Sequence, residues 1–161
     1  LLPLKLVAPS PYQISLKYIF SCYNYTMKIT SEQEMLNFGK DFANRQDPLS
    51  IIELIGDVGA GKTTFVRGLA KGLGIKENIT SPSFTISKTY ALPNGKTLTH
   101  YDFYRLNDPG IMQEDLTESF QNPNNITVIE WADSVENLLP KNRTRISIKY
   151  NDNDSREVTV L

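Results

Sequence analysis

A glycine-rich segment between a short apolar run and a helical segment constrains this chain more than any other feature of its sequence. Residues 56–63 read GDVGAGKT and fit the pattern G-x-x-x-x-G-K-[ST] at every fixed position. Residues 50–55 (SIIELI) are rich in β-branched residues, as in a buried parallel strand. A helix is predicted over about 62–73, where Gly72 and Gly74 can end it. A strand, a glycine-rich turn and a helix in this order predict a phosphate-binding P-loop.

Each fixed position of this loop has a chemical reason. Its glycines allow successive backbone N–H groups to line one concavity at a helix N-terminus, where a phosphate can bind. Lys62 supplies a positive charge to the β- and γ-phosphates of a nucleotide, and Thr63 offers a hydroxyl to Mg²⁺. The alternative is a glycine-rich turn without a ligand, and in the empty site we expect Lys62 to be exposed. The predicted cofactor-binding residues of the loop are Asp57, Val58, Gly59, Ala60, Gly61, Lys62, Thr63 and Thr64.

A site of this kind usually needs a further acid, at the end of a neighbouring strand, to hold Mg²⁺ directly or through water. Glu130 follows the apolar run 126–129, so it is the candidate for the metal shell together with Thr63. Asp102 ends a more polar strand and is predicted to act near the γ-phosphate, in orienting water. Lys62, Asp102 and Glu130 are therefore the predicted catalytic residues. For each acid the alternative is a surface carboxylate at a strand end.

The nucleotide is predicted to be ATP. The sequence contains no N-K-x-D segment to recognise guanine and no D-x-x-G segment after a strand. Guanine nucleotides are disfavoured for this reason, and ATP with Mg²⁺ is the expected cofactor pair.

The composition excludes several classes of protein. The 161 residues fit a single domain, and the net charge of −1 argues against a surface built for nucleic-acid phosphates. One cysteine, Cys22, and one histidine, His100, exclude a disulfide framework and a histidine-rich metal centre. No apolar run approaches the roughly 18 to 20 residues that span a bilayer. We therefore expect a small cytoplasmic protein without membrane contact.

The order of the predicted elements indicates one α/β domain over residues 27–161. We predict a mainly parallel central P-loop sheet, antiparallel strands added within 84–104 and 145–161, and helices on both faces. Ser31 and Glu34 form a capping box ahead of the first helix. The predicted strand pairs are 84–90 with 96–104, across a Pro-Asn-Gly turn, and 145–150 with 156–161, and a helix is predicted over 108–120.

Residues 1–26 differ from the rest of the chain. They contain three prolines and two lysines but no acidic residue, and no apolar run suited to a signal peptide. We interpret them as an upstream extension or an over-long gene prediction and assign them no function.

Four segments carry a resemblance to a known family. They read GDVGAGKTTFVRGLAKGLG from residue 56, TSPSFT from residue 80, HYDFYRL from residue 100 and VIEW from residue 128. Together they resemble the TsaE (formerly YjeE) family, small bacterial ATPases of the tRNA threonylcarbamoyladenosine (t6A) pathway. The loop alone is generic, whereas the three later segments together are specific. The resemblance covers about residues 30–156 and departs from the family where Asp115 stands in place of a usual glycine.

The resemblance implies roles for residues of this chain. Thr63 with Glu130 would hold Mg²⁺, Asp102 would be needed for hydrolysis, and Trp131 would lie beside the nucleotide. We expect the Trp131 ring to be partly exposed at the rim of the site, the alternative being ordinary core beneath residues 135–139.

More distant positions also have family counterparts. Thr80 and Ser81 would belong to a switch-like loop. Glu32 would lie near the nucleoside, and the turn before Arg156 would approach it too. The family acts with TsaD and TsaB, and TsaD transfers the threonylcarbamoyl group to adenosine 37 of tRNA. The resemblance therefore implies protein partners and only indirect contact with tRNA.

Two other functions remain open at this point. A small-molecule P-loop kinase shares the loop and the size, but the acidic segment 131–136 (WADSVE) does not resemble an arginine-rich lid. The other alternative is a binding module that is controlled by the nucleotide and for which hydrolysis is incidental. Among the remaining residues, we expect His100 to be structural and the pair Arg143 and Arg145 to lie on a solvated strand face.

Overall fold

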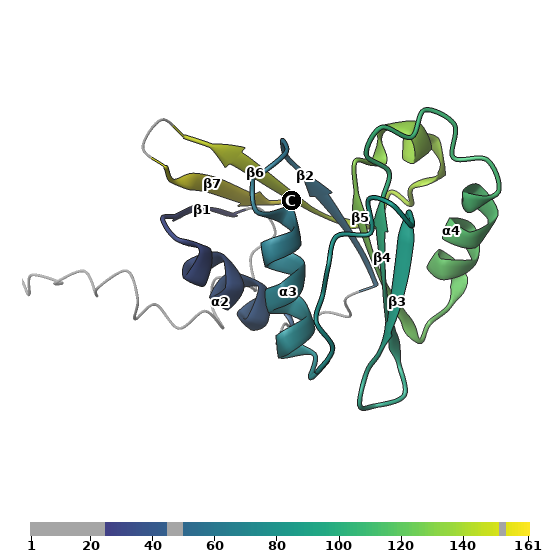
Figure 1. Cartoon of the computed structure of the whole chain (residues 1–161), viewed down its shortest axis with the longest axis horizontal. Coiled ribbons are helices and arrows are strands. Elements are labelled where there is room, and N and C mark those ends of the chain that lie inside the picture. The colour runs from purple at the N-terminus through teal and green to yellow at the C-terminus, as the bar shows by residue number, and fades with distance from the viewer. Residues whose placement is uncertain (1–24, 45–49, 152–153) are drawn as a thin grey trace, which may run out of the picture.

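A seven-stranded sheet organises the described part of the protein. The structure is a computed structural model and describes residues 25–44, 50–151 and 154–161. In spatial order β1-β7-β6-β2-β5-β4-β3, the four central strands run parallel, and antiparallel strands flank them (Figure 1). This confirms the predicted parallel core with added antiparallel strands. The strands are β1 (Tyr25–Ile29), β2 (Ile51–Ile55), β3 (Ser87–Ala91), β4 (Thr97–Asp102), β5 (Asn125–Glu130), β6 (Thr144–Tyr150) and β7 (Arg156–Val160).

Helices cover both faces of this sheet, as predicted. The helices α2 (Glu32–Phe42) and α3 (Lys62–Gly72) lie side by side on one face (Figure 1). They approach closely because Gly39 and Gly68 lie at their crossing, where a Cβ atom on either residue would collide with the backbone of the other helix. Within the described ranges, no helix has the length and apolar character needed to cross a membrane. The opposite face carries α4 (Met112–Gln121) and the short 3-10 helix η1 (Ala132–Leu138).

The alternation of side chains along β5 explains its unbroken apolar run. Val128 packs on the side of α2 and α3, and Ile129 packs on the side of α4. All six residues of the strand are buried, because both faces are covered. A side chain at the carboxyl end of β5 is therefore placed by the rigid centre of the domain.

The first helix begins as its sequence predicts. The Glu34 N–H donates to the Ser31 hydroxyl over 3.1 Å, which makes Ser31 the N-cap of α2. The Glu34 carboxylate accepts from the Thr30 N–H over 2.7 Å, one residue before the usual partner. The capping box fixes the entry into α2.

The boundaries of the sheet differ from the predicted ones in two places. β1 begins at Tyr25, opposite Val160 of β7, two residues before the predicted start of the domain at 27. Residues 1–24 of the predicted extension lie outside the described residues.

β3 begins at Ser87 and not at Phe84. The Thr85 and Ile86 N–H groups both donate to the Pro82 carbonyl, over 2.9 and 2.7 Å, and Ile86 has a positive φ of 66°. The chain therefore makes a turn here, which leaves the Phe84 ring fully exposed to solvent.

The prediction that Arg143 is solvated is wrong, whereas Arg145 is exposed as expected. The Arg143 guanidinium donates to Glu53 over 2.7 Å and to Glu136 over 2.8 Å. Glu53 lies on the central strand β2, so its buried carboxylate requires a positive partner.

Asp115 lies in the first turn of α4, where the family usually has glycine. The helix continues regularly through this position. The Asp115 carboxylate accepts from the Tyr101 hydroxyl over 2.7 Å, which links α4 to β4.

Candidate nucleotide site

The carboxyl ends of β2, β5 and β4 meet at one edge of the sheet, where the glycine-rich loop follows β2. Leu54 of β2 and Asp102 of β4 both lie opposite Glu130 of β5 in the strand registers. A cleft of about 330 Å³ opens at this edge. The structure thus brings the loop and both predicted acids together. The lining residues are Val58, Gly59, Gly61, Lys62, Thr63, Thr64, Arg67, Ser81, Ser83, Asp102, Tyr104, Glu130 and Trp131.

The glycine-rich loop adopts backbone conformations that suit glycine. Gly59 and Gly61 have positive φ angles of 79° and 109°, which L-residues with a Cβ rarely adopt. Gly61 is the N-cap of α3, and no side chain of the described residues caps this helix. The N–H groups of the first turn of α3 are therefore left for another acceptor, an arrangement that suits an anion.

The Lys62 side chain is buried, and the prediction that it is exposed is wrong. It is 5% exposed, and its ammonium group donates to the carbonyls of Gly56 over 2.7 Å and Asp57 over 2.9 Å. The loop curls around its own lysine, which explains the burial. Burial lowers the pKa of Lys62 below its ordinary value, although nearby carboxylates, Glu130 first among them, oppose the shift.

The Glu130 carboxylate is held by side chains of two packed elements. It is 3% exposed, and its Oε1 accepts from His100 Nε2 over 3.0 Å and from the Thr63 hydroxyl over 3.4 Å. Its Oε2 lies 3.9 Å from the Lys62 ammonium nitrogen. Glu130 is therefore not a surface carboxylate but the centre of a buried polar cluster.

Asp102 is equally buried, at 3% exposure, but its partners come from a loop. Its Oδ2 accepts from the hydroxyls of Ser81 and Ser83, over 2.8 and 2.5 Å. Its Oδ1 accepts from the Tyr104 N–H over 3.0 Å. Both oxygens of the carboxylate are thus oriented.

The side chains at the cleft suit a hard cation. The hydroxyl of Thr63 and the carboxylate of Glu130 are oxygen donors that lie 3.4 Å apart, and Mg²⁺ prefers such ligands. No group of three or more His, Cys, Asp or Glu side chains in the described residues could hold a metal ion alone. An ion bound at Thr63 and Glu130 would need nucleotide oxygens and water to complete its octahedron.

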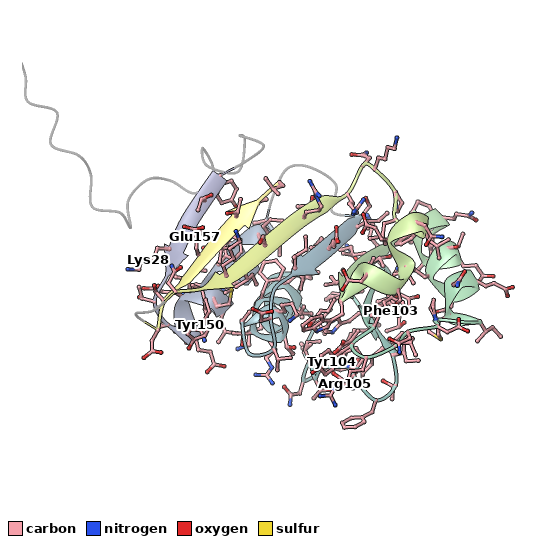
Figure 2. All side chains as sticks on the ribbon, turned by 90° about the horizontal axis from the view of Figure 1, so that it is seen from above. Lys28, Phe103, Tyr104, Arg105, Tyr150 and Glu157 are labelled. Carbon is pink, nitrogen blue, oxygen red and sulfur yellow. The ribbon has the colours of Figure 1, made fainter. Side chains whose placement is uncertain are left out.

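The Trp131 ring lies half-buried at the rim of the cleft, as its sequence position predicted. Trp131 has a left-handed backbone, with φ of 57°, which turns the chain as it leaves β5. The Lys62 ammonium group lies 4.4 Å from the centre of the indole ring, and the Tyr104 ring lies 4.9 Å away. Figure 2 labels Tyr104 beside Arg105, whose guanidinium lies 4.9 Å from the Tyr104 ring.

The positions predicted to lie near the nucleoside surround the cleft without lining it. Glu32 is exposed at the start of α2, and its carboxylate lies 3.9 Å from the Arg67 guanidinium. Arg156 donates from Nε to the Ala60 carbonyl over 3.1 Å, so the last hairpin contacts the glycine-rich loop directly.

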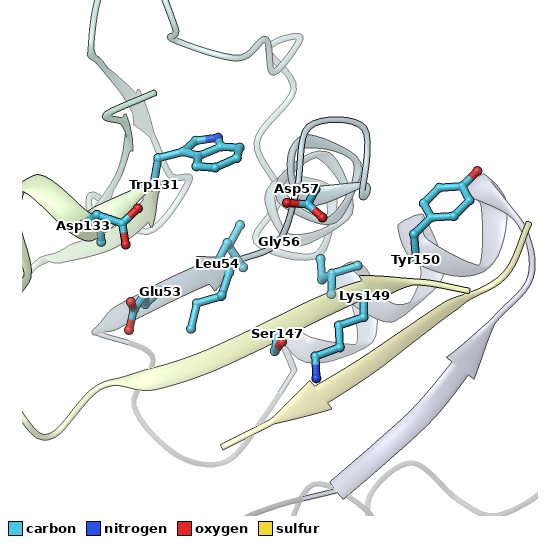
Figure 3. A pocket seen from close by; sticks show the side chains of 12 residues that line it. Glu53, Leu54, Gly56, Asp57, Trp131, Asp133, Ser147, Lys149 and Tyr150 are labelled. Carbon is cyan, nitrogen blue, oxygen red and sulfur yellow. The ribbon is translucent and has the colours of Figure 1, made fainter. Parts of the chain in front are cut away.

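A second hollow, of about 610 Å³, lies where the loop leaves β2, between Trp131 and β6 (Figure 3). Asp57 and Trp131 face it, together with Tyr150 and Lys149 of β6. Asp57 thus lines this hollow and not the smaller cleft, while Trp131 borders both.

Sequence reasoning missed two contacts to the acids of the cleft. His100, which was expected to be structural, is fully buried behind the cleft; its contact with Glu130 was not predicted, although strand alternation places it on the same face as Asp102. Ser83 lies beyond the predicted switch residues and contacts Asp102, whereas Thr80 is exposed and lines no part of the cleft.

The comparisons with known proteins agree with the family resemblance found in the sequence. The model of the family described as "Threonylcarbamoyl adenosine biosynthesis protein TsaE" matches residues 29–158. The tRNA threonylcarbamoyladenosine biosynthesis protein TsaE of Haemophilus influenzae is 35% identical over 141 residues, which cover 84% of this chain and 88% of that protein. The protein of the same name from Bacillus subtilis is 42% identical over 116 residues, covering 70% and 69%.

A solved structure is similar as well. The crystal structure of Bacillus subtilis YdiB superposes with a TM-score of 0.69 and 35% sequence identity, over 85% of this chain and 84% of that one. Sequence and fold therefore agree, and the chain belongs to the TsaE family of tRNA threonylcarbamoyladenosine biosynthesis proteins.

Proposed function

We propose that this protein binds and hydrolyses Mg-ATP, and that it does so as the ATPase of the t6A machinery, acting on a complex of TsaD and TsaB in the cytoplasm. The observation that carries the proposal is the cluster in which Lys62, Thr63 and Glu130 meet at the N-terminus of α3. These are the groups that phosphate and Mg²⁺ require, and they come from the loop and the neighbouring strand of one cleft.

The hydrogen-bond donors of the loop and of the first turn of α3 support phosphate binding. The Lys62 ammonium group donates to two neutral carbonyls, so an arriving phosphate offers it a charged acceptor and a stronger hydrogen bond. The free N–H groups of the first turn of α3 would bind the same phosphates. The ion held by Thr63 and Glu130 would neutralise charge on the phosphate oxygens.

Asp102 suits a role at the γ-phosphate. Its two oxygens are oriented by three hydrogen bonds, and the carboxylate lines the same cleft as Lys62. A buried carboxylate whose oxygens are oriented by hydrogen bonds can orient a water molecule for attack on phosphorus. We therefore assign hydrolysis to Asp102 and metal binding to Glu130.

A protein complex is the proposed target of this hydrolysis. The family membership supports it, since the relatives are named for tRNA threonylcarbamoyladenosine biosynthesis. Exposed apolar side chains flank the cleft: Val58 lies on the loop and Phe84 on the segment that holds Asp102. Such side chains suit contact with another protein surface.

Turnover with and without partners tests the proposal. We expect slow ATP hydrolysis by the protein alone and faster hydrolysis when the TsaD and TsaB homologues of the same organism are added, and we expect affinity-tagged protein to recover both homologues from a lysate. Lys62→Ala protein serves as the control for contaminating ATPases. Recovery of neither homologue, with turnover that depends on a small acceptor, would instead support a P-loop kinase.

A further inference from the structure

His100 is a fully buried histidine whose two ring nitrogens have different surroundings. Its side chain is 0% exposed, and Nε2 lies 3.0 Å from Glu130 Oε1. Within the described residues Nδ1 is buried without a hydrogen-bond partner. A carboxylate only accepts hydrogen bonds, so Nε2 carries the proton. A proton on Nδ1 would be a buried donor without an acceptor, which is costly. The geometry therefore favours one tautomer, with its donor directed at Glu130.

Because of this hydrogen bond, the two oxygens of Glu130 have different partners. Oε1 accepts from His100 and from Thr63, whereas Oε2 lies 3.9 Å from the Lys62 nitrogen, beyond hydrogen-bond distance. A small rotation of the carboxylate would close that gap and form a direct ion pair. Such a pair would occupy both the metal-binding acid and the phosphate-binding lysine.

We propose that His100 is a positioning residue, whose Nε2–H holds Glu130 in the orientation that serves Mg²⁺ and keeps it from closing on Lys62. The inference rests on the proposed function, because it assigns Glu130 to the metal. Hydrogen bonds made to a metal-ligating carboxylate by residues behind it typically contribute 10- to 100-fold to metal affinity. His100 lies on β4 next to β5, so the packed sheet fixes the donor.

The test measures ATP binding by calorimetry at increasing Mg²⁺ concentrations. His100→Leu removes the donor at similar volume, and we expect a Mg²⁺ midpoint about tenfold higher. His100→Gln keeps an N–H donor near the Nε2 position and should restore most of the affinity. His100→Asn places its donor near Nδ1, too short to reach Glu130, and should behave like the leucine variant.

Tyr101→Phe is the matched control. It also removes a buried hydrogen bond from β4, but on the opposite face, toward Asp115 of α4. A general loss of strand stability would affect both positions, whereas positioning of Glu130 concerns His100 alone. We expect the control to keep the Mg²⁺ midpoint of the unmodified protein.

A second measurement needs no substitution at His100. This is the only histidine in the sequence, so nitrogen-15 NMR reports a single ring. We expect the tautomer protonated at Nε2, and a changed Nε2 signal in Glu130→Gln protein, because the acceptor is altered. A ring protonated only at Nδ1, or a His100→Leu variant with an unchanged Mg²⁺ midpoint, would overturn the positioning role. If the unmodified protein binds no Mg-ATP, the proposed function fails and this inference fails with it.

Discussion

The two acids of the cleft lie opposite each other in neighbouring strands, yet different parts of the molecule hold them. Glu130 contacts His100 of β4 and Thr63 of α3, which belong to the packed sheet and its covering helix. Asp102 contacts Ser81 and Ser83, two exposed residues of the segment before β3.

The side-chain partners of Glu130 are thus parts of the packed core, whereas those of Asp102 are exposed loop residues. The partners of Glu130 belong to the packed core, whereas Ser81 and Ser83 are exposed and lie outside every helix and strand, although Ile86 at the end of their segment is tied to β4. Under the proposed function, we expect Glu130 to form a constant metal site and Asp102 to respond to the nucleotide. The following predictions test that separation, from the largest expected effect to the smallest.

Loss of either acid should abolish turnover, and the Mg²⁺ dependence should separate them. We expect Glu130→Ala and Asp102→Ala each to lower ATP hydrolysis by about 100-fold or more. Glu130→Ala should also weaken the Mg²⁺ dependence of nucleotide binding, whereas Asp102→Ala should still bind Mg-ATP. Calorimetry with and without Mg²⁺ measures both. The reverse pattern would exchange the two roles.

Lys62 is near both acids, and its loss should weaken nucleotide binding. Neither acid can supply the positive charge that is lost. We expect Lys62→Ala to lower ATP affinity at least tenfold, about 1.4 kcal/mol, because backbone amides alone do not offset the phosphate charge. The exposed Lys76 offers a matched control, since Lys76→Ala removes the same charge outside the cleft. Unchanged affinity in Lys62→Ala protein would contradict the phosphate site.

The serines that hold Asp102 should affect turnover but not metal binding. We expect the double variant Ser81→Ala, Ser83→Ala to lower hydrolysis about fivefold, since a lost hydrogen bond contributes about 1 kcal/mol. Thr85→Val is the control, because it removes a hydroxyl from the same segment that does not touch Asp102. A shifted Mg²⁺ midpoint in the double variant would mean that the two acids are not independent.

The smallest effect is spectroscopic and uses Trp131, the only tryptophan. Its half-buried ring lies beside Lys62 and Tyr104, so nucleotide binding should change its solvation. We expect a saturable shift of emission on addition of Mg-ATP, with the same midpoint as calorimetry. A flat emission during a saturating titration would remove Trp131 from the site and leave Lys62 unaffected.

Much of the fold could be predicted because its signals are local. The apolar run before the loop, the Ser31 cap and the Pro-Asn-Gly turn each depend on a few neighbouring residues. The boundaries near Tyr25 and Phe84 were wrong for a different reason. β1 forms because it pairs with β7, which lies more than a hundred residues away in the sequence. The turn after Pro82 is formed by backbone hydrogen bonds to the Pro82 carbonyl, which the alternation of apolar and polar residues does not predict.

The sequence by itself determined that the glycine-rich loop and the two acids at strand ends meet at one cleft, because both are recognisable from neighbouring residues alone. Only the tertiary structure decided which groups touch. It buried Lys62 against its own loop, paired Arg143 with Glu53, and directed His100 at Glu130. These contacts join residues of different strands and helices, and burial makes an unpaired charge or donor costly. The polar partners are therefore selected by proximity in the folded chain, which no local pattern encodes.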